Sequence, residues 1–148
     1  MSDTATLSLE ITRHFEAAPE RVFDAWLSKT WCEWLPPRGV QCELSLLDAK
    51  VGGRYHTVMR MPDGRTVNIA GVYREIDRPK KIVLTWTGDY DNRESLITVT
   101  FWATANGTQM TLRQEGFASI DQRDRHNSGW TGENGSFDKL AALLAKTA

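Results

Sequence analysis

Hydrophobic and polar residues alternate along most of this chain, and that alternation predicts a protein built mainly from strands. From Leu7 to Phe15 the two kinds of residue largely alternate, which is typical of a half-buried strand. Six further runs of this kind lie between Val40 and Glu115, separated by turn residues such as Asn106-Gly107. We therefore expect about seven strands in an antiparallel meander.

Two short helices are predicted directly after the first strand. Pro19 suits the first position of a helix, where its missing N–H costs nothing, and an apolar face follows it. A second short helix carries Trp31 and Trp34 and ends at Pro36-Pro37, because proline cannot continue a helix.

The longest helical pattern runs from Ser119 to Leu144. Ser119 followed by Gln122 fits a capping box, which sets the start of the helix. The end of the segment carries an i, i+3, i+4, i+7 apolar stripe that must lie against the sheet, formed by Phe137, Leu140, Ala141 and Leu144. The chain is thus predicted to be a segregated α+β protein with one long C-terminal helix.

The middle of this helix is its weakest part. Gly129, Gly132 and Gly135 each lower helix propensity by roughly 1 kcal/mol relative to alanine. A break between Ser128 and Ser136 is therefore an open alternative to one continuous helix. In that case Ser136 is expected to cap the second segment.

Length and charge restrict the classes of function. A chain of 148 residues with 41% hydrophobic residues is predicted to form one domain over residues 1–148. Its formal net charge of −1 does not favour nucleic acid as a partner. No apolar run reaches membrane-spanning length and no signal-peptide pattern occurs at Met1–Leu9, so we expect a cytoplasmic protein without a membrane span.

Metal and cofactor chemistry is not indicated by any motif. His14, His56 and His126 lack ligand spacing, and phosphate-binding, zinc-protease and calcium loops do not occur in the sequence. Cys32 and Cys42 are too far apart to suggest a zinc site, and in a cytosolic chain we expect reduced thiols. The sequence therefore predicts a protein without a metal or cofactor.

Aromatic residues are the most distinctive candidates for a site, because six tryptophans can either wall a cavity or fill a core. Glu75 and Gln114 fall on faces of strands that are otherwise apolar, so each either orients a ligand or is satisfied by a neighbouring group. The candidate ligand-binding residues are Trp34, Tyr55, Met59, Tyr73, Glu75, Trp86, Val99, Phe101, Gln114, Trp130 and Phe137.

A family resemblance adds to these predictions. It rests on the order of Phe15, Pro19-Glu-Arg-Val-Phe-Asp-Ala-Trp, Trp34, Gly52-Gly53, Asp63-Gly64, Gly71-Val-Tyr-Arg-Glu-Ile, Leu84-Thr-Trp, Gly107-Thr, and His126 with Gly129-Trp130. In this order the chain resembles the START-like SRPBCC superfamily, and within it the branch named for the activator of the heat-shock-protein-90 ATPase. The resemblance implies a helix-grip fold, in which a curved sheet surrounds the long C-terminal helix and encloses an apolar cavity.

Relatives in this superfamily bind lipids or hydrophobic small molecules, cyclise polyketides, or act as co-chaperones, so the fold does not settle the function. Binding of a hydrophobic small molecule or lipid is the leading hypothesis, because no nucleophile–base pair is evident. The alternatives are a cyclase- or hydrolase-like enzyme that uses Glu75 or a nearby histidine as general base, and a stress-response co-chaperone with a chaperone partner. The sequence also leaves open a homodimer.

Overall fold

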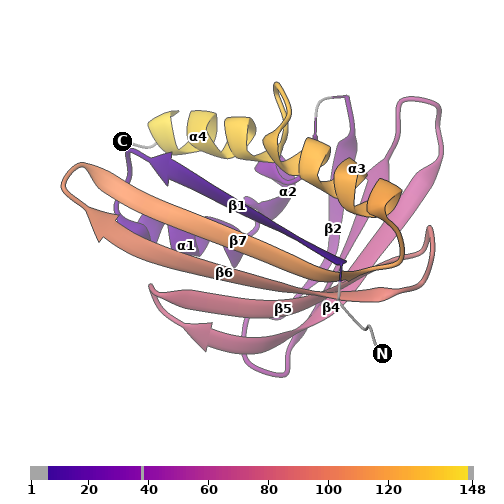
Figure 1. Ribbon diagram of the computed structural model, residues 1–148, viewed down its shortest axis with the longest axis horizontal. Coiled ribbons are helices and arrows are strands. Elements are labelled where there is room, and N and C mark those ends of the chain that lie inside the picture. Colours follow the sequence, from indigo (N-terminus) through magenta and orange to yellow (C-terminus); the bar gives the residue numbers. More distant parts are fainter. Residues whose placement is uncertain (1–6, 38, 147–148) are drawn as a thin grey trace.

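One antiparallel sheet of seven strands forms the centre of the structure, a computed structural model that describes residues 7–37 and 39–146 (Figure 1). The strands lie in the order β1-β7-β6-β5-β4-β3-β2, so the first strand pairs with the last and the others form a meander. The expected seven strands are confirmed. Their bounds are β1 Leu7–Phe15, β2 Gln41–Leu47, β3 Arg54–Arg60, β4 Thr66–Asp77, β5 Lys81–Gly88, β6 Glu94–Thr104 and β7 Gly107–Phe117.

Four helices lie on the concave side of the curved sheet (Figure 1): α1 Pro19–Trp26, α2 Trp31–Trp34, α3 Ile120–Thr131 and α4 Ser136–Lys146. Pro19 opens α1 as predicted. The Ser119 side chain accepts the backbone N–H of Gln122 at 3.1 Å, which confirms the predicted start of α3. In the described part of the chain, no helix combines the length and apolar character needed to cross a membrane.

The C-terminal helical segment is divided at residues 132–135. A break in this glycine-containing stretch was one of the two alternatives that the sequence left open. Gly132 leaves the helical conformation with φ −63° and ψ 164°. Asn134 then adopts a positive φ of 58°, a left-handed conformation that asparagine tolerates better than most residues. The division sets α3 and α4 as separate helices, which pack against each other.

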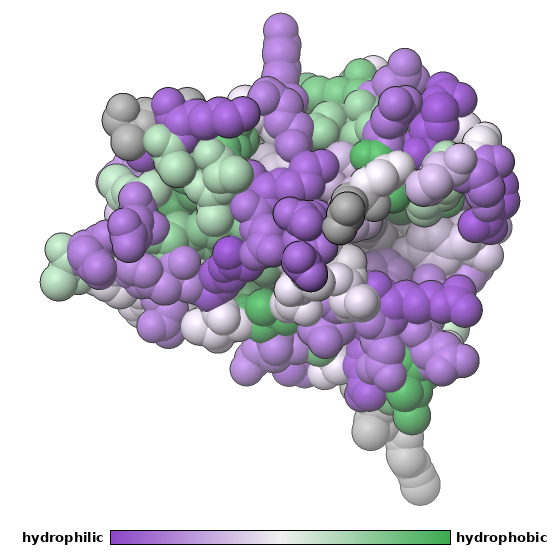
Figure 2. Space-filling view, turned by 90° about the horizontal axis from the view of Figure 1, so that it is seen from above, coloured by the Kyte–Doolittle hydropathy of each residue, from purple (hydrophilic) through white to green (hydrophobic). Residues whose placement is uncertain are grey.

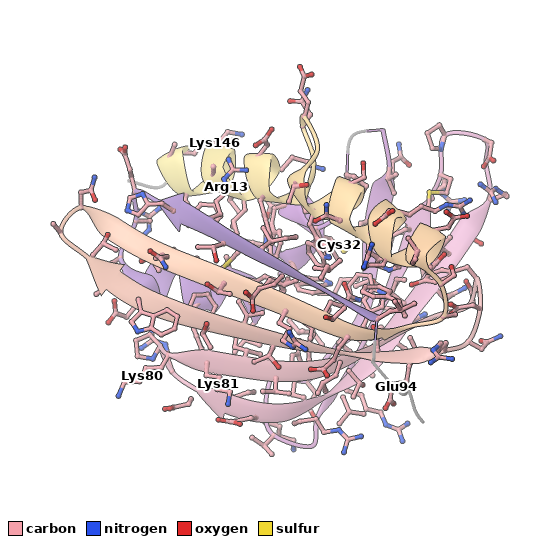
Figure 3. All side chains as sticks on the ribbon, viewed as in Figure 1. Arg13, Cys32, Lys80, Lys81, Glu94 and Lys146 are labelled. Carbon is pink, nitrogen blue, oxygen red and sulfur yellow. A yellow bond between two sulfur atoms is a disulfide. The ribbon has the colours of Figure 1, made fainter. Side chains whose placement is uncertain are left out.

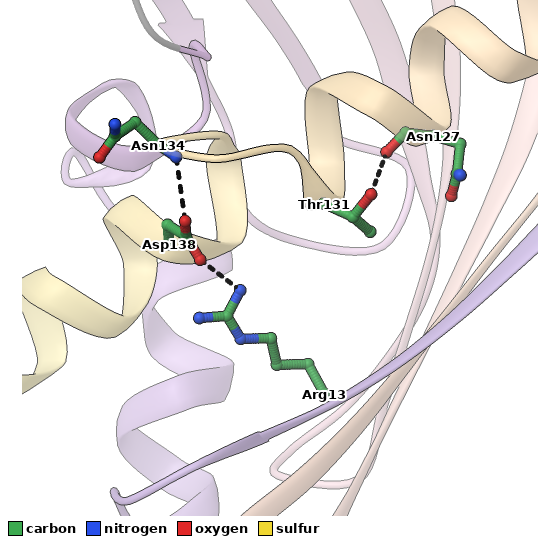
Figure 4. A network of polar contacts seen from close by, with 5 residues as sticks. All are labelled: Arg13, Asn127, Thr131, Asn134 and Asp138. Carbon is green, nitrogen blue, oxygen red and sulfur yellow. Dashed lines mark hydrogen bonds and ion pairs between the residues drawn. The ribbon is translucent and has the colours of Figure 1, made fainter.

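The expected cap of the second helix was wrong. The Ser136 hydroxyl donates to the backbone carbonyl of Leu35 and so ties α4 to the end of α2. The carboxylate of Asp138 accepts the backbone N–H of Asn134 at 2.9 Å and the guanidinium of Arg13 at 2.7 Å (Figure 4). Asp138, in the first turn of α4, therefore fixes the connection between α3 and α4 and links it to β1.

The apolar stripe of α4 is buried as predicted, apart from Ala141, which is only partly buried. Phe137 and Leu140 are fully buried and Leu144 is 6% exposed. The ring of Phe137 stacks on Trp130 with centroids 5.3 Å apart and meets Phe15 of β1 edge-on at 6.4 Å. Seen from above in Figure 2, hydrophilic residues cover the middle of the face that carries the helices, and hydrophobic ones gather at the end where α4 lies.

The two cysteines are joined, which corrects the expectation of reduced thiols. Cys32 of α2 and Cys42 of β2 form a disulfide, with their Cα atoms 5.3 Å apart. That expectation rested on an assumed reducing, cytosolic compartment. Helix α2 packs beside β2, and this packing brings the two positions within the usual Cα range for a disulfide. A cytoplasmic location stays a prediction.

Candidate functional site

A cavity of about 290 Å³ lies between helix α3 and strands β3 to β5. The strands contribute its apolar floor, α3 contributes one wall, and the segment after α2 closes one end. The residues that line it are Leu35, Pro37, Met59, Met61, Arg65, Val67, Ile69, Trp86, Tyr90, Gln122, Arg125, His126, Gly129, Trp130 and Ser136.

Two nearly buried indoles line the cavity. Trp86 of β5 and Trp130 of α3 are 5% and 3% exposed, and their rings lie 5.8 Å apart. The side-chain amide of Gln114 holds Trp130 in place, because its oxygen accepts the indole N–H at 3.1 Å. Its nitrogen donates to the Ser95 hydroxyl at 2.9 Å. Gln114 is thus satisfied by its neighbours and acts on the cavity only through Trp130.

Gly129 leaves space on the α3 wall. A Cβ atom built at this position would meet no other atom within 4 Å, so the absent side chain contributes directly to the volume of the cavity. Because α3 continues through this residue with ordinary helical backbone, the glycine is not required there by backbone geometry.

A chain of hydrogen bonds crosses the polar side of the cavity. The indole N–H of Trp86 donates to the Tyr90 hydroxyl at 3.1 Å, and that hydroxyl lies 2.9 Å from Nε2 of His126. Nδ1 of His126 lies 3.0 Å from the backbone carbonyl of Gln122. A carbonyl can only accept, so Nδ1 carries the hydrogen, and Nε2 of the neutral ring accepts the Tyr90 O–H.

Partial burial favours the neutral form of both partners of this pair. It lowers the pKa of His126 from its ordinary value of 6.5, against smaller opposing effects of the Gln122 carbonyl and Asp91. It also raises the pKa of Tyr90 above its ordinary value of 10.0. At neutral pH the site therefore contains an unprotonated imidazole and an intact phenol.

Formal charge in the lining is entirely positive. Arg65 and Arg125 are its only charged residues in the described part of the chain, and no carboxylate lines the cavity. Arg65 is engaged by Asp63, with Nε 2.7 Å from the carboxylate. Both arginines are exposed, which places their charge at the mouth of the cavity and the indoles at its base.

Only three of the residues expected at a site line this cavity, namely Met59, Trp86 and Trp130. The others, apart from Glu75, are buried in the surrounding core, where they support the walls: Trp34, Tyr55, Tyr73, Val99, Phe101, Gln114 and Phe137. The interpretation of the tryptophans as core residues therefore holds for Trp34, whereas Trp86 and Trp130 are both core and cavity wall.

Glu75 does not face the cavity, which corrects the expectation that it is a polar anchor. Strict alternation places Tyr73 and Glu75 on the same face of β4, but the pairing with β5 shifts between them. The bulge at this shift turns the carboxylate outward. Glu75 is exposed and lies 3.5 Å from Lys81, which points away from the helices (Figure 3).

The polar residues that line the cavity were not among the predicted site residues, although the sequence contains one signal for them. Gln122, Arg125, His126 and Gly129 have i, i+3, i+4, i+7 spacing, so they form one stripe along α3. Apolar periodicity does not detect a stripe of this composition. Tyr90 stands in a polar loop with no periodic signal, so only the folded chain reveals its contact with His126.

A curved antiparallel sheet that surrounds C-terminal helices, with a cavity between them, defines a helix-grip protein of the START-like class. A protein from Chromobacterium violaceum has the same fold, with 28% identity, coverage of 93% of this chain and 96% of that one, and a TM-score of 0.86. The AHSA1 protein from Silicibacter pomeroyi is 27% identical, with coverage of 96% and 100% and a TM-score of 0.79.

The family follows from the sequence. Residues 16–145 match the profile described as Activator of Hsp90 ATPase homolog 1-like protein, and the chain belongs to this family. No curated protein matches the chain significantly in sequence.

Proposed function

We propose that this protein binds a hydrophobic small molecule in the cavity between α3 and the sheet. The observation that carries the proposal is an apolar recess lined by Trp86 of β5 and Trp130 of α3, with its polar side chains mainly on α3 and at the mouth. Ligand sites commonly combine an apolar lining with a few convergent polar groups, and the volume of about 290 Å³ lies near the lower end of their range.

The arrangement gives a bound molecule a defined orientation. An apolar body placed against the indoles leaves water and gains roughly 25 cal/mol per Å² of buried surface. A polar end is then directed to the Tyr90 and His126 side and the mouth of the cavity. A lipid with long chains exceeds the volume, so the proposed ligand is small.

Gly129 allows a sharp test of this function. 1-Aminonaphthalene, a small, neutral and mainly apolar fluorophore, should bind saturably and change the emission of Trp86 and Trp130. Gly129→Phe should abolish this binding, because the new ring fills the cavity at a position where no atom obstructs it. Gly129→Ala is the matched control and should retain binding, since one methyl group occupies little of the volume. A folded wild-type protein that takes up no 1-aminonaphthalene would reject the proposal.

The hydrogen-bonded pair of Tyr90 and His126 favours a second candidate function, which is proton abstraction from the bound molecule. A ligand proton passed to the phenol oxygen is balanced when the phenol proton passes to Nε2 of His126, which leaves the ligand as an anion. The low pKa of His126 keeps the ring ready to accept at neutral pH. Glu75 has no place in this step because it lies outside the cavity.

Deuterium exchange separates catalysis from binding. A ligand that copurifies with the protein, identified by native mass spectrometry, is incubated with the protein in D₂O and followed for deuterium uptake. If His126 takes the proton, His126→Gln should stop the uptake and leave affinity nearly unchanged. Glu75→Gln is the control and should behave as wild type. Absence of uptake with the wild-type protein would leave binding as the only function of the cavity.

A further inference from the structure

The charged residues around the cavity indicate a chemical class for its ligand, which the shape of the cavity alone does not. The whole chain has a net charge of −1, yet the described residues that line the cavity carry two arginines and no acidic group. From this contrast we propose, given the binding function above, that the ligand is a small apolar molecule with one carboxylate, and that Arg125 binds this carboxylate at the mouth of the cavity.

Of the two arginines, Arg125 is better placed than Arg65 to bind a carboxylate. It stands on the α3 stripe that faces the cavity, three residues after Gln122 and four before Gly129. Within the described chain its guanidinium has no hydrogen-bond or ion-pair partner, whereas that of Arg65 is held by Asp63 at 2.7 Å. A guanidinium remains charged at every relevant pH and matches a carboxylate with two parallel N–H donors.

Tyr90 completes the polar contacts of the site. Its oxygen accepts the Trp86 N–H and its hydrogen is donated to His126, so at neutral pH it offers no hydrogen to the ligand. Tyr90 therefore supplies no donor to the carboxylate, whereas Arg125 does, with Arg65 contributing a second positive charge. The apolar body lies deeper, against the indoles of Trp86 and Trp130.

The volume limits the size of the ligand. A water molecule occupies about 30 Å³ in the liquid, so a cavity of 290 Å³ holds roughly ten groups of similar size. One carboxylate on a short apolar chain fills it. Octanoate has this composition, and octanamide is its neutral counterpart with the same shape, so the two compounds form a matched pair of probes.

Isothermal titration of the intact protein with both probes tests the proposal. Octanoate should bind about tenfold more tightly than octanamide, the effect of one charge-assisted contact at an exposed site. The ratio should fall as salt is raised, because the guanidinium is open to solvent. Arg125→Gln should bring the ratio close to one by weakening octanoate alone.

Arg123→Gln is the matched control. Arg123 stands on the same helix, lies 3.2 Å from Asp124 and does not line the cavity, so its loss should leave the ratio unchanged. Equal affinity of the two probes for the wild-type protein would overturn the carboxylate proposal. An unchanged ratio in Arg125→Gln would overturn it as well. If 1-aminonaphthalene binds and neither octanoate nor octanamide does, the ligand class is wrong and the binding function stands. If none of the three compounds binds, the binding function itself fails.

Discussion

Replacement of Phe137 by alanine should remove the contact on which α4 and the back of the cavity depend. The ring is fully buried, stacks on Trp130 at 5.3 Å and meets Phe15 at 6.4 Å. Truncation of a buried phenylalanine typically costs about 3–5 kcal/mol, and aromatic pairs contribute roughly 0.5–1.5 kcal/mol beyond burial. We therefore expect a loss of about 4 kcal/mol in the free energy of unfolding, a large fraction of the stability of a typical domain.

Urea titration followed by tryptophan fluorescence measures this loss. Trp102→Ala is the matched control, because this larger side chain is 58% exposed on β6 and its removal should cost less than about 1 kcal/mol. The reasoning is refuted if Phe137→Ala loses less than about 1 kcal/mol, or no more than the control. Either result would mean that α4 does not hold the packing described above.

Three further predictions concern single contacts. Ser119→Ala should lower the free energy of unfolding by about 1 kcal/mol through loss of the N-cap, whereas Ser119→Asp should retain most of it in the same urea titration. Reduction of the Cys32–Cys42 disulfide, which closes a short loop, should cost about 2–3 kcal/mol, and the reductant should have no effect on a Cys32→Ser variant. Stability should decline as pH falls below 6.5 toward the lower folded-state pKa of His126, because the unfolded chain then binds more protons; His126→Gln should flatten this part of the pH profile.

Local pattern alone determined the elements of the fold. Alternation marks β1, the side chain of Ser119 marks the start of α3, and the spacing from Phe137 to Leu144 marks the buried face of α4. These signals are reliable because strand period, cap and helix period depend on residues within a few positions of one another. The order of short motifs along the chain also indicates the correct family, because it extends over nearly the whole domain.

Tertiary structure decided the site. One bulge in β4 turned Glu75 out of the cavity, and the packing of α2 beside β2 brought Cys32 to Cys42. The polar wall requires Tyr90 from a loop to meet His126 from a helix 36 residues later. Such contacts depend on where distant segments come to lie, and neither residue type nor local period encodes that position. The sequence therefore determined that a cavity of this class would form, and the packing of α3 on the sheet decided which residues line it.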